Sequence, residues 1–207
     1  LNYSIIIKNT SLKEIALLPS IETKGIFNGS LLFKENFIYI KGDVTELGLL
    51  NLNLGNSFVD LSIDTDKSTL KLTECFLKNT FKNSINGSLD LEKSLLDIRI
   101  LANNISSKHI KSIYPFSFLK FLQGSFNGTI NISNEFENPK YLIEGSLEKA
   151  SFMNNYFEKI DFSATYNERD FILQNFSVNK KSEFLKGDFH YNFLNKKIEK
   201  FSLNSSS

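Results

Sequence analysis

Apolar and polar residues alternate along most of this chain with a period of two residues. Ile5 and Ile7 follow the pattern near the start, and residues 96–100 follow it near the middle. Such alternation is typical of strands that bury one face, because successive side chains of a strand point to opposite faces of the sheet. Polar segments such as 64–67 and 195–197 separate the runs and have the length of hairpin loops. The pattern therefore predicts a mainly β protein built as an antiparallel meander.

Two segments depart from the alternation and predict short helices. In residues 11–18, apolar positions have helical spacing, Ser11 is placed to cap the helix, and Pro19 ends it. Residues 107–122 resemble the first segment, with Pro115 as the interruption. We expect the apolar side chains of both helices to pack against the apolar edge of the sheet: Leu12, Ile15 and Leu18 in the first, and Ile110, Ile113, Phe116, Phe118 and Leu122 in the second.

An internal repeat links these segments to the strands that follow them. The segment GIFNGSLL at 25–32 recurs as GSFNGTIN at 124–131. An irregularity recurs as well, because the apolar parity changes between Leu72 and Cys75 and again between Leu173 and Phe176. A slip at the same place in both copies predicts a bulge there.

The repeat predicts two units, 1–102 and 103–207, each with one short helix and about six strands. Sheets built from repeats can be extended strand by strand. We therefore expect the chain to be an internal piece of a longer protein.

Three Asn-Gly pairs, at 28–29, 86–87 and 127–128, allow two interpretations. Asn-Gly between alternating segments is a strong signal for a type I′ hairpin turn. Glycine also occurs within strands where a sheet curves or two backbones approach closely. The sequence alone leaves both interpretations open.

Composition removes several classes of function. The 207 residues carry a net charge of +1 and no basic stripe, so a nucleic acid is not an expected partner. The single cysteine, Cys75, cannot form an internal disulfide, and we expect it to be a plain buried residue. His109 and His190 are far apart in the sequence and have no carboxylate or cysteine cluster near them, so we expect them to have structural or solvent-exposed roles. With no phosphate loop, nucleophile elbow or metal-spaced pair, we expect no enzyme activity, catalytic residue, metal or cofactor.

One segment carries a resemblance to a known family. Residues 124–132 (GSFNGTINI) are followed by Asn138-Pro139 and then by 142–147 (LIEGSL). This succession resembles the signature of the TamB and AsmA-like proteins of diderm bacteria. The resemblance continues through 157–165 and 171–178 to Gly187, and the first copy repeats most of it.

The resemblance implies a β-taco, a long sheet curled into an open groove with an apolar inner face. It further implies a segment of a conduit that carries phospholipid between the inner and outer membranes and supports outer-membrane biogenesis. The implied location is the periplasm, with an inner-membrane anchor outside this sequence. An outer-membrane barrel protein is an implied partner through parts of the chain not present, and phospholipid acyl chains are the implied ligand.

The alternating residues are the candidates for the inner face. We expect the following to line the groove: Ile5, Ile7, Val59, Leu61, Ile63, Leu89, Leu91, Ile98, Ile100, Ile160, Phe162, Leu173, Leu185, Phe189 and Tyr191. The same pattern has a second interpretation, the dry core of a sandwich or of a structural or adhesive β-stalk on a cell surface. A groove that binds acyl chains and a stalk with a dry core differ in whether the inner face is filled by the protein's own side chains.

Overall fold

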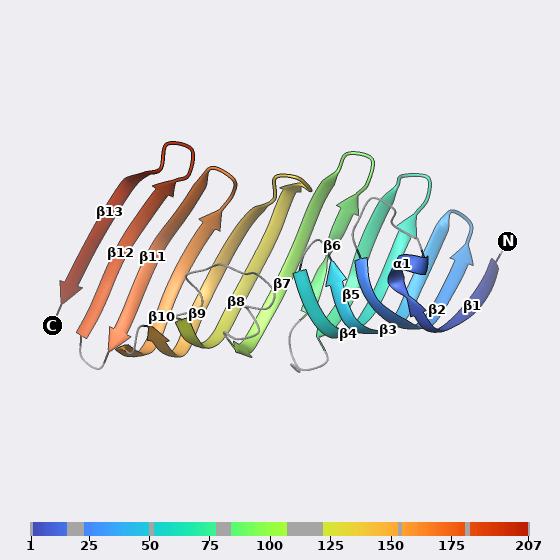
Figure 1. Cartoon of the computed structure of the whole chain (residues 1–207), viewed down its shortest axis with the longest axis horizontal. Helices are drawn as coiled ribbons and strands as arrows, with labels where there is room; N and C mark the ends of the chain where they lie inside the picture. The colour runs from blue at the N-terminus through green and yellow to red at the C-terminus, as the bar shows by residue number, and fades with distance from the viewer. Residues whose placement is uncertain are drawn as a thin grey trace. The chain divides into compact units, whose positions relative to one another are not determined.

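The computed structural model describes residues 2–15, 23–49, 52–77, 84–106, 122–152, 155–180 and 183–206 (Figure 1). Within them lie thirteen strands, ordered in the sheet as they are in the sequence. Every pairing whose register is described is antiparallel. The strands are β1 (Asn2–Ser11), β2 (Thr23–Lys34), β3 (Phe37–Leu49), β4 (Leu52–Asp64), β5 (Thr69–Leu77), β6 (Ser84–Asp90), β7 (Leu95–Ser106), β8 (Leu122–Glu135), β9 (Lys140–Phe152), β10 (Asn155–Tyr166), β11 (Asp170–Lys180), β12 (Glu183–Asn192) and β13 (Lys197–Ser206).

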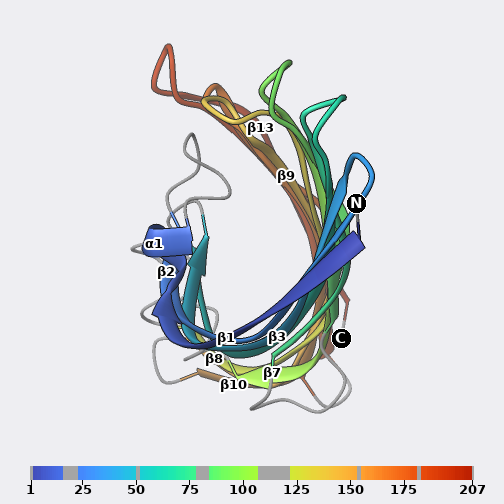
Figure 2. The same ribbon diagram turned by 90° about the vertical axis from the view of Figure 1, so that its right-hand side faces the viewer.

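The predicted fold class is confirmed. The protein is an antiparallel meander whose first and last strands are the ends of the order rather than partners of each other. The strands are strongly bent, so that the sheet of each unit has a concave side (Figure 2). A curled, open antiparallel sheet therefore replaces the two packed layers of a sandwich.

The chain divides into two compact units within β7, between Ile100 and Leu101. The first unit contains β1 to β6 and the first half of β7, and the second contains the rest. The repeat boundary at residues 102 and 103, which rests on sequence periodicity, stays a prediction.

The one helix among the described residues is α1 (Leu12–Ile15), directly after β1. It forms within the segment predicted to be helical, although Leu18 lies outside the described residues. Most of the second predicted helix, residues 107–121, lies outside them too. Leu122 is the first residue of β8 rather than the end of a helix.

Cross-strand register explains how the alternating residues share one face. In the first unit, Ile5 pairs with Leu31, Leu31 with Ile40, Ile40 with Leu61, and Leu61 with Leu72. Directly opposite residues of antiparallel strands point to the same face, so this row of side chains is continuous across five strands.

The change of parity in the sequence corresponds to bulges, as predicted. The register of β4 and β5 shifts between Asp60 and Leu61, and that of β5 and β6 shifts between Leu72 and Cys75. In the second unit the equivalent shifts fall after Asp161 and after Leu173. Each bulge lets apolar residues of opposite parity continue on the same concave face, which a regular strand cannot do.

The Asn-Gly pairs lie inside strands, so their interpretation as hairpin turns is wrong. Gly29 of β2 lies opposite Gly42 of β3, and Gly128 of β8 lies opposite Gly145 of β9. A Cβ atom at Gly29 would stand 2.3 Å from the carbonyl oxygen of Lys41 and 2.6 Å from the ring of Phe27. The two backbones approach so closely here that only glycine fits, and the preceding aromatic ring covers the gap.

The asparagine of each pair has a separate role. Asn28 Oδ1 accepts a hydrogen bond of 2.9 Å from the backbone N–H of Asn9, and Asn127 Oδ1 accepts one of 2.7 Å from Asn104. Asn9 and Asn104 both have left-handed backbones, with φ of 51° and 55°. The side chain therefore satisfies a backbone donor that an irregular strand leaves without its ladder partner.

Candidate functional site

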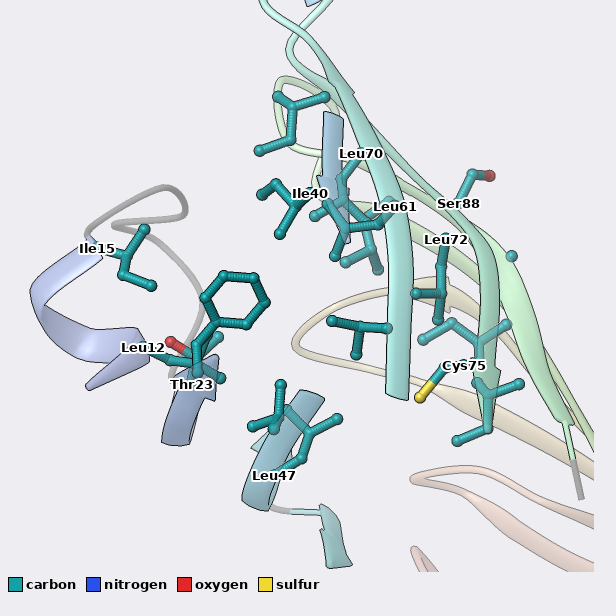
Figure 3. A pocket seen from close by; sticks show the side chains of 18 of the residues that line it. Leu12, Ile15, Thr23, Ile40, Leu47, Leu61, Leu70, Leu72, Cys75 and Ser88 are labelled. Carbon is teal, nitrogen blue, oxygen red and sulfur yellow. The ribbon is translucent and has the colours of Figure 1, made fainter. Parts of the chain in front are cut away.

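The concave side of the first unit encloses an apolar cavity of about 110 Å³ (Figure 3). We call this cavity and the side chains around it the apolar groove. Its lining residues come from α1 and from strands β2 to β7, and none of them carries a charge. They are Leu12, Ile15, Thr23, Phe27, Ile40, Val44, Leu47, Val59, Leu61, Ile63, Leu70, Leu72, Cys75, Ile85, Gly87, Ser88, Leu89, Ile98 and Ile100.

Register places these side chains in parallel rows across the sheet. One row contains Ile40, Leu61 and Leu72, and the row beside it contains Ile63, Leu70 and Leu89. Because each row runs across several strands, apolar contacts continue along the sheet. A ligand that fits this surface is held by contacts without directional hydrogen bonds.

Helix α1 contributes to the apolar groove as well as to its edge. Leu12 and Ile15 both line the cavity, and in Figure 3 they stand across it from the side chains of the strands. Both are half-buried. Their placement agrees with the expectation that the first helix packs on the apolar edge of the sheet. Helix α1 thereby covers one side of the concave face.

The predicted lining residues of the first unit divide into two groups. Six of the nine line the cavity: Val59, Leu61, Ile63, Leu89, Ile98 and Ile100. Ile5 and Ile7 are not among the cavity residues, although Ile5 shares a row with Leu31; the Ile5 side chain is 44% exposed on the edge strand β1. Leu91 lies in the turn after β6 and is therefore outside the rows of side chains that the paired strands form.

In the second unit the predicted residues surround a packed core instead of a described cavity. Ile160 is buried in a cluster with Phe126, and Phe162 and Leu185 pack against that cluster. Leu173, Phe189 and Tyr191 are half-buried on rows of the same face, since Leu173 pairs with Phe189. Ile160, Phe162 and Leu185 are therefore part of a packed apolar cluster on this face.

Sequence reasoning did not select several residues that dominate the concave face. Phe27, Ile40 and Val44 are all buried there, and Phe27 is 0% exposed. Phe27 belongs to the repeated GIFNG segment, whose Asn-Gly pair is also a signal for a hairpin turn. Its recurrence as Phe126 was the available signal, because an aromatic residue at the same place in both copies indicates a shared packing role.

Cys75 is buried in the lining of the apolar groove, beside the buried Ser57. Burial raises the pKa of the Cys75 thiol from 9.0 to about 12, and a hydrogen bond with the Ser57 side chain lowers it by a smaller amount. The thiol therefore stays protonated and unreactive in the folded protein at neutral pH. This environment agrees with the expectation of a plain buried residue.

The Cys75 pKa predicts a loss of stability in alkali. Above about pH 9 the thiol ionises in the unfolded chain but not in the folded one, so the unfolded state binds fewer protons and stability falls as pH rises. Between about pH 8 and about pH 10 we expect the wild type to lose about 1.4 kcal/mol more unfolding free energy than Cys75→Ala. Urea denaturation of both proteins at the two pH values measures the difference, and equal losses would show an ionisable, hydrated thiol.

No protein-family description, curated protein or solved structure matches this chain. Among the described residues, no helix is long and apolar enough to cross a membrane. The same residues contain no group of three or more His, Cys, Asp or Glu side chains placed to hold a metal ion.

Proposed function

We propose that this chain is a segment of a TamB/AsmA-like groove protein and that its apolar groove holds the acyl chains of phospholipids. The observation that carries the proposal is the uncharged lining of the concave face, which extends over α1 and strands β2 to β7 of one open sheet. The repeated GIFNG and GSFNG segments, and the LIEGSL segment at 142–147 that follows Asn138-Pro139, support the family. The groove would then form part of a periplasmic path for phospholipid between two membranes, with any anchor and barrel partner supplied by other parts of the chain.

The energetics of the lining suit a sliding ligand. Each methylene group of an acyl chain that leaves water gains about 0.8 kcal/mol. Neighbouring strands stand about 4.8 Å apart, so six strands offer about 24 Å of apolar path. Rows such as Ile40, Leu61 and Leu72 repeat similar contacts from strand to strand. A ligand therefore exchanges one set of contacts for an equivalent set as it moves.

A structural or adhesive stalk with a dry core is the alternative function. The cluster around Phe126 and Ile160 in the second unit favours it, because the protein's own side chains pack against one another there. The apolar space of about 110 Å³ in the first unit favours the groove, since the protein's own side chains leave this part of the concave face unfilled. The two functions differ in whether a lipid occupies the first unit.

Native mass spectrometry of the chain purified from lipid-containing extracts tests the proposal. We expect co-purified phospholipid, and we expect Leu61→Asn to lower its occupancy about tenfold by removing apolar contact from the centre of the groove. Ser62→Asn is the matched control, because Ser62 is the next residue of β4 and points to the opposite face. A lipid-free wild type that also fails to take up added fluorescent fatty acid would favour the stalk.

A further inference from the structure

Three hairpin turns of this protein share one construction. In each turn the side-chain oxygen of a cap residue, Asp64, Asp90 or Asn192, accepts a hydrogen bond from the backbone N–H three residues later. The donors are Lys67 at 3.2 Å, Lys93 at 2.9 Å and Asn195 at 3.1 Å. The last turn residue is left-handed in all three cases, with φ of 49° at Ser68, 55° at Ser94 and 54° at Lys196. The three turns therefore form a matched set, each joining an even-numbered strand to the next.

One turn of the set differs in chemistry. The second turn position holds an acid in the first two turns, Asp66 and Glu92, and holds Leu194 in the third. The Leu194 side chain is 68% exposed. Since the same geometry forms with an acid at this position, the turn itself does not require leucine, and burial does not explain it either.

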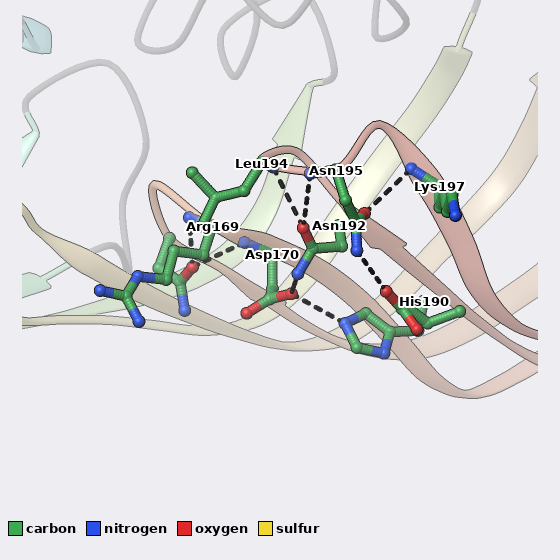
Figure 4. Close-up of polar contacts among 9 residues, drawn as sticks. Arg169, Asp170, His190, Asn192, Leu194, Asn195 and Lys197 are labelled. Carbon is green, nitrogen blue, oxygen red and sulfur yellow. Dashed lines mark hydrogen bonds and ion pairs between the residues drawn. The ribbon is translucent and has the colours of Figure 1, made fainter.

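The charge of the third turn also differs. Residues 64–69 and 90–95 each carry a net charge of −1, whereas residues 192–197 carry +2, from Lys196 and Lys197. The cap is the neutral Asn192, whose amide donates to Asp170 at 3.0 Å (Figure 4). An exposed leucine thus stands beside two exposed lysines. The six residues contain no acid, and the carboxylates that contact them are Asp170, at the cap, and Glu199, which accepts from Asn195 Nδ2 at 2.8 Å.

The base of this turn is held firmly. The ring of Phe193 packs edge-on against Tyr191 at 5.2 Å and against Tyr166 at 5.8 Å between ring centroids. The Phe193 N–H donates to the carbonyl of Arg169 at 2.6 Å. The aromatic cluster fixes the turn, and Leu194 projects beyond it. We call Phe193, Leu194, Lys196 and Lys197 the hairpin finger.

We propose that the hairpin finger docks this protein onto an anionic lipid bilayer surface. Leu194 would enter the boundary between head groups and acyl chains, and Lys196 and Lys197 would pair with lipid phosphates. Tyr191 and Tyr166 have the apolar ring and polar hydroxyl that suit this boundary. The charge of +2 favours an anionic membrane over a neutral one. The proposal does not depend on lipid occupancy of the apolar groove, because the finger lies outside the groove lining.

Co-sedimentation of the full chain with vesicles tests the proposal. The probes are phosphatidylcholine vesicles with and without a minority of phosphatidylglycerol. We expect binding to the mixed vesicles that weakens as salt screens the lysines. Leu194→Glu should weaken binding about tenfold. Glutamate is the residue at the equivalent position of the second turn, Glu92. The double substitution Lys196→Ser and Lys197→Thr should weaken vesicle binding about thirty-fold. It introduces the residue types of the first turn, where Ser68 and Thr69 occupy the same positions.

Leu203→Glu is the matched control, because Leu203 is an exposed leucine of β13 that belongs to the concave face and not to the finger. We expect it to bind mixed vesicles like the wild type. An equal loss in Leu203→Glu and Leu194→Glu would place membrane contact at the edge of the sheet and overturn the proposal. Binding by the wild type to neither vesicle would also overturn it and would leave a protein partner for the finger. Neither result would alter the amount of phospholipid that native mass spectrometry detects in the apolar groove. The two proposals can therefore fail independently.

Discussion

Phe126→Ala should lower the free energy of unfolding by about 4 kcal/mol. The Phe126 side chain is 2% exposed and belongs to the core cluster of the second unit. Its ring packs against Phe162 at 6.0 Å between centroids and covers the close approach of Gly128 and Gly145. The two glycines have no side chains that could move into the space left by the ring, so they cannot help to fill the cavity. Urea denaturation followed by circular dichroism measures the loss.

Phe201→Ala is the control for this substitution. Phe201 lies on β13 on the same face, since it pairs with Phe189, but its side chain is 67% exposed. We expect a change within about 0.5 kcal/mol, as for most surface substitutions. If both substitutions lower the free energy of unfolding by the same amount, the packing of the Phe126 ring over the two glycines adds no stability of its own.

The strand meander could be predicted from the sequence because its cause is local. Alternation along 96–100 reports the buried face of β7 directly, and Leu96, Ile98 and Ile100 are all buried. The bulge after Leu72 could also be predicted, since a change of parity in the sequence has few other physical explanations.

The Asn-Gly pairs could not be assigned, because their role depends on contacts distant in sequence. Asn28 bonds the backbone of Asn9, and Gly29 lies against Gly42. A turn preference acts over two residues, whereas these contacts arise only after three strands have paired. Tertiary pairing therefore overrides a strong local signal.

The candidate site was only partly predictable for a related reason. Val59, Leu61 and Ile63 were selected by alternation and do line the apolar groove. Leu91 follows the same alternation, but it lies where β6 has ended and the turn has begun. Strand ends are set by cap residues such as Asp90, whose side chain accepts a bond from the Lys93 N–H, and hydrophobic pattern alone does not report them.

In the first unit, Gly29→Val should lower the free energy of unfolding by at least about 4 kcal/mol, as much as Phe126→Ala, or prevent folding completely. The atoms that a new Cβ would meet are the Lys41 carbonyl oxygen at 2.3 Å and the Gly42 Cα at 2.7 Å. Both belong to the backbone of β3, so neither can move without breaking the pairing of β2 and β3. The ring of Phe27, at 2.6 Å, would be displaced as well. The branched side chain adds further atoms on the face where no space remains.

Gly55→Asn tests whether the loss at Gly29 comes from the close approach or from glycine replacement in general. Gly55 has a left-handed backbone, with φ of 66°, and a Cβ there would meet nothing within 4 Å. Asparagine tolerates this conformation better than most residues, so we expect a change below about 1 kcal/mol. Urea denaturation of both variants provides the comparison. A loss below about 1 kcal/mol for Gly29→Val would mean that β2 and β3 can separate at this point at little cost, and that the paired glycines do not set the curvature of the sheet.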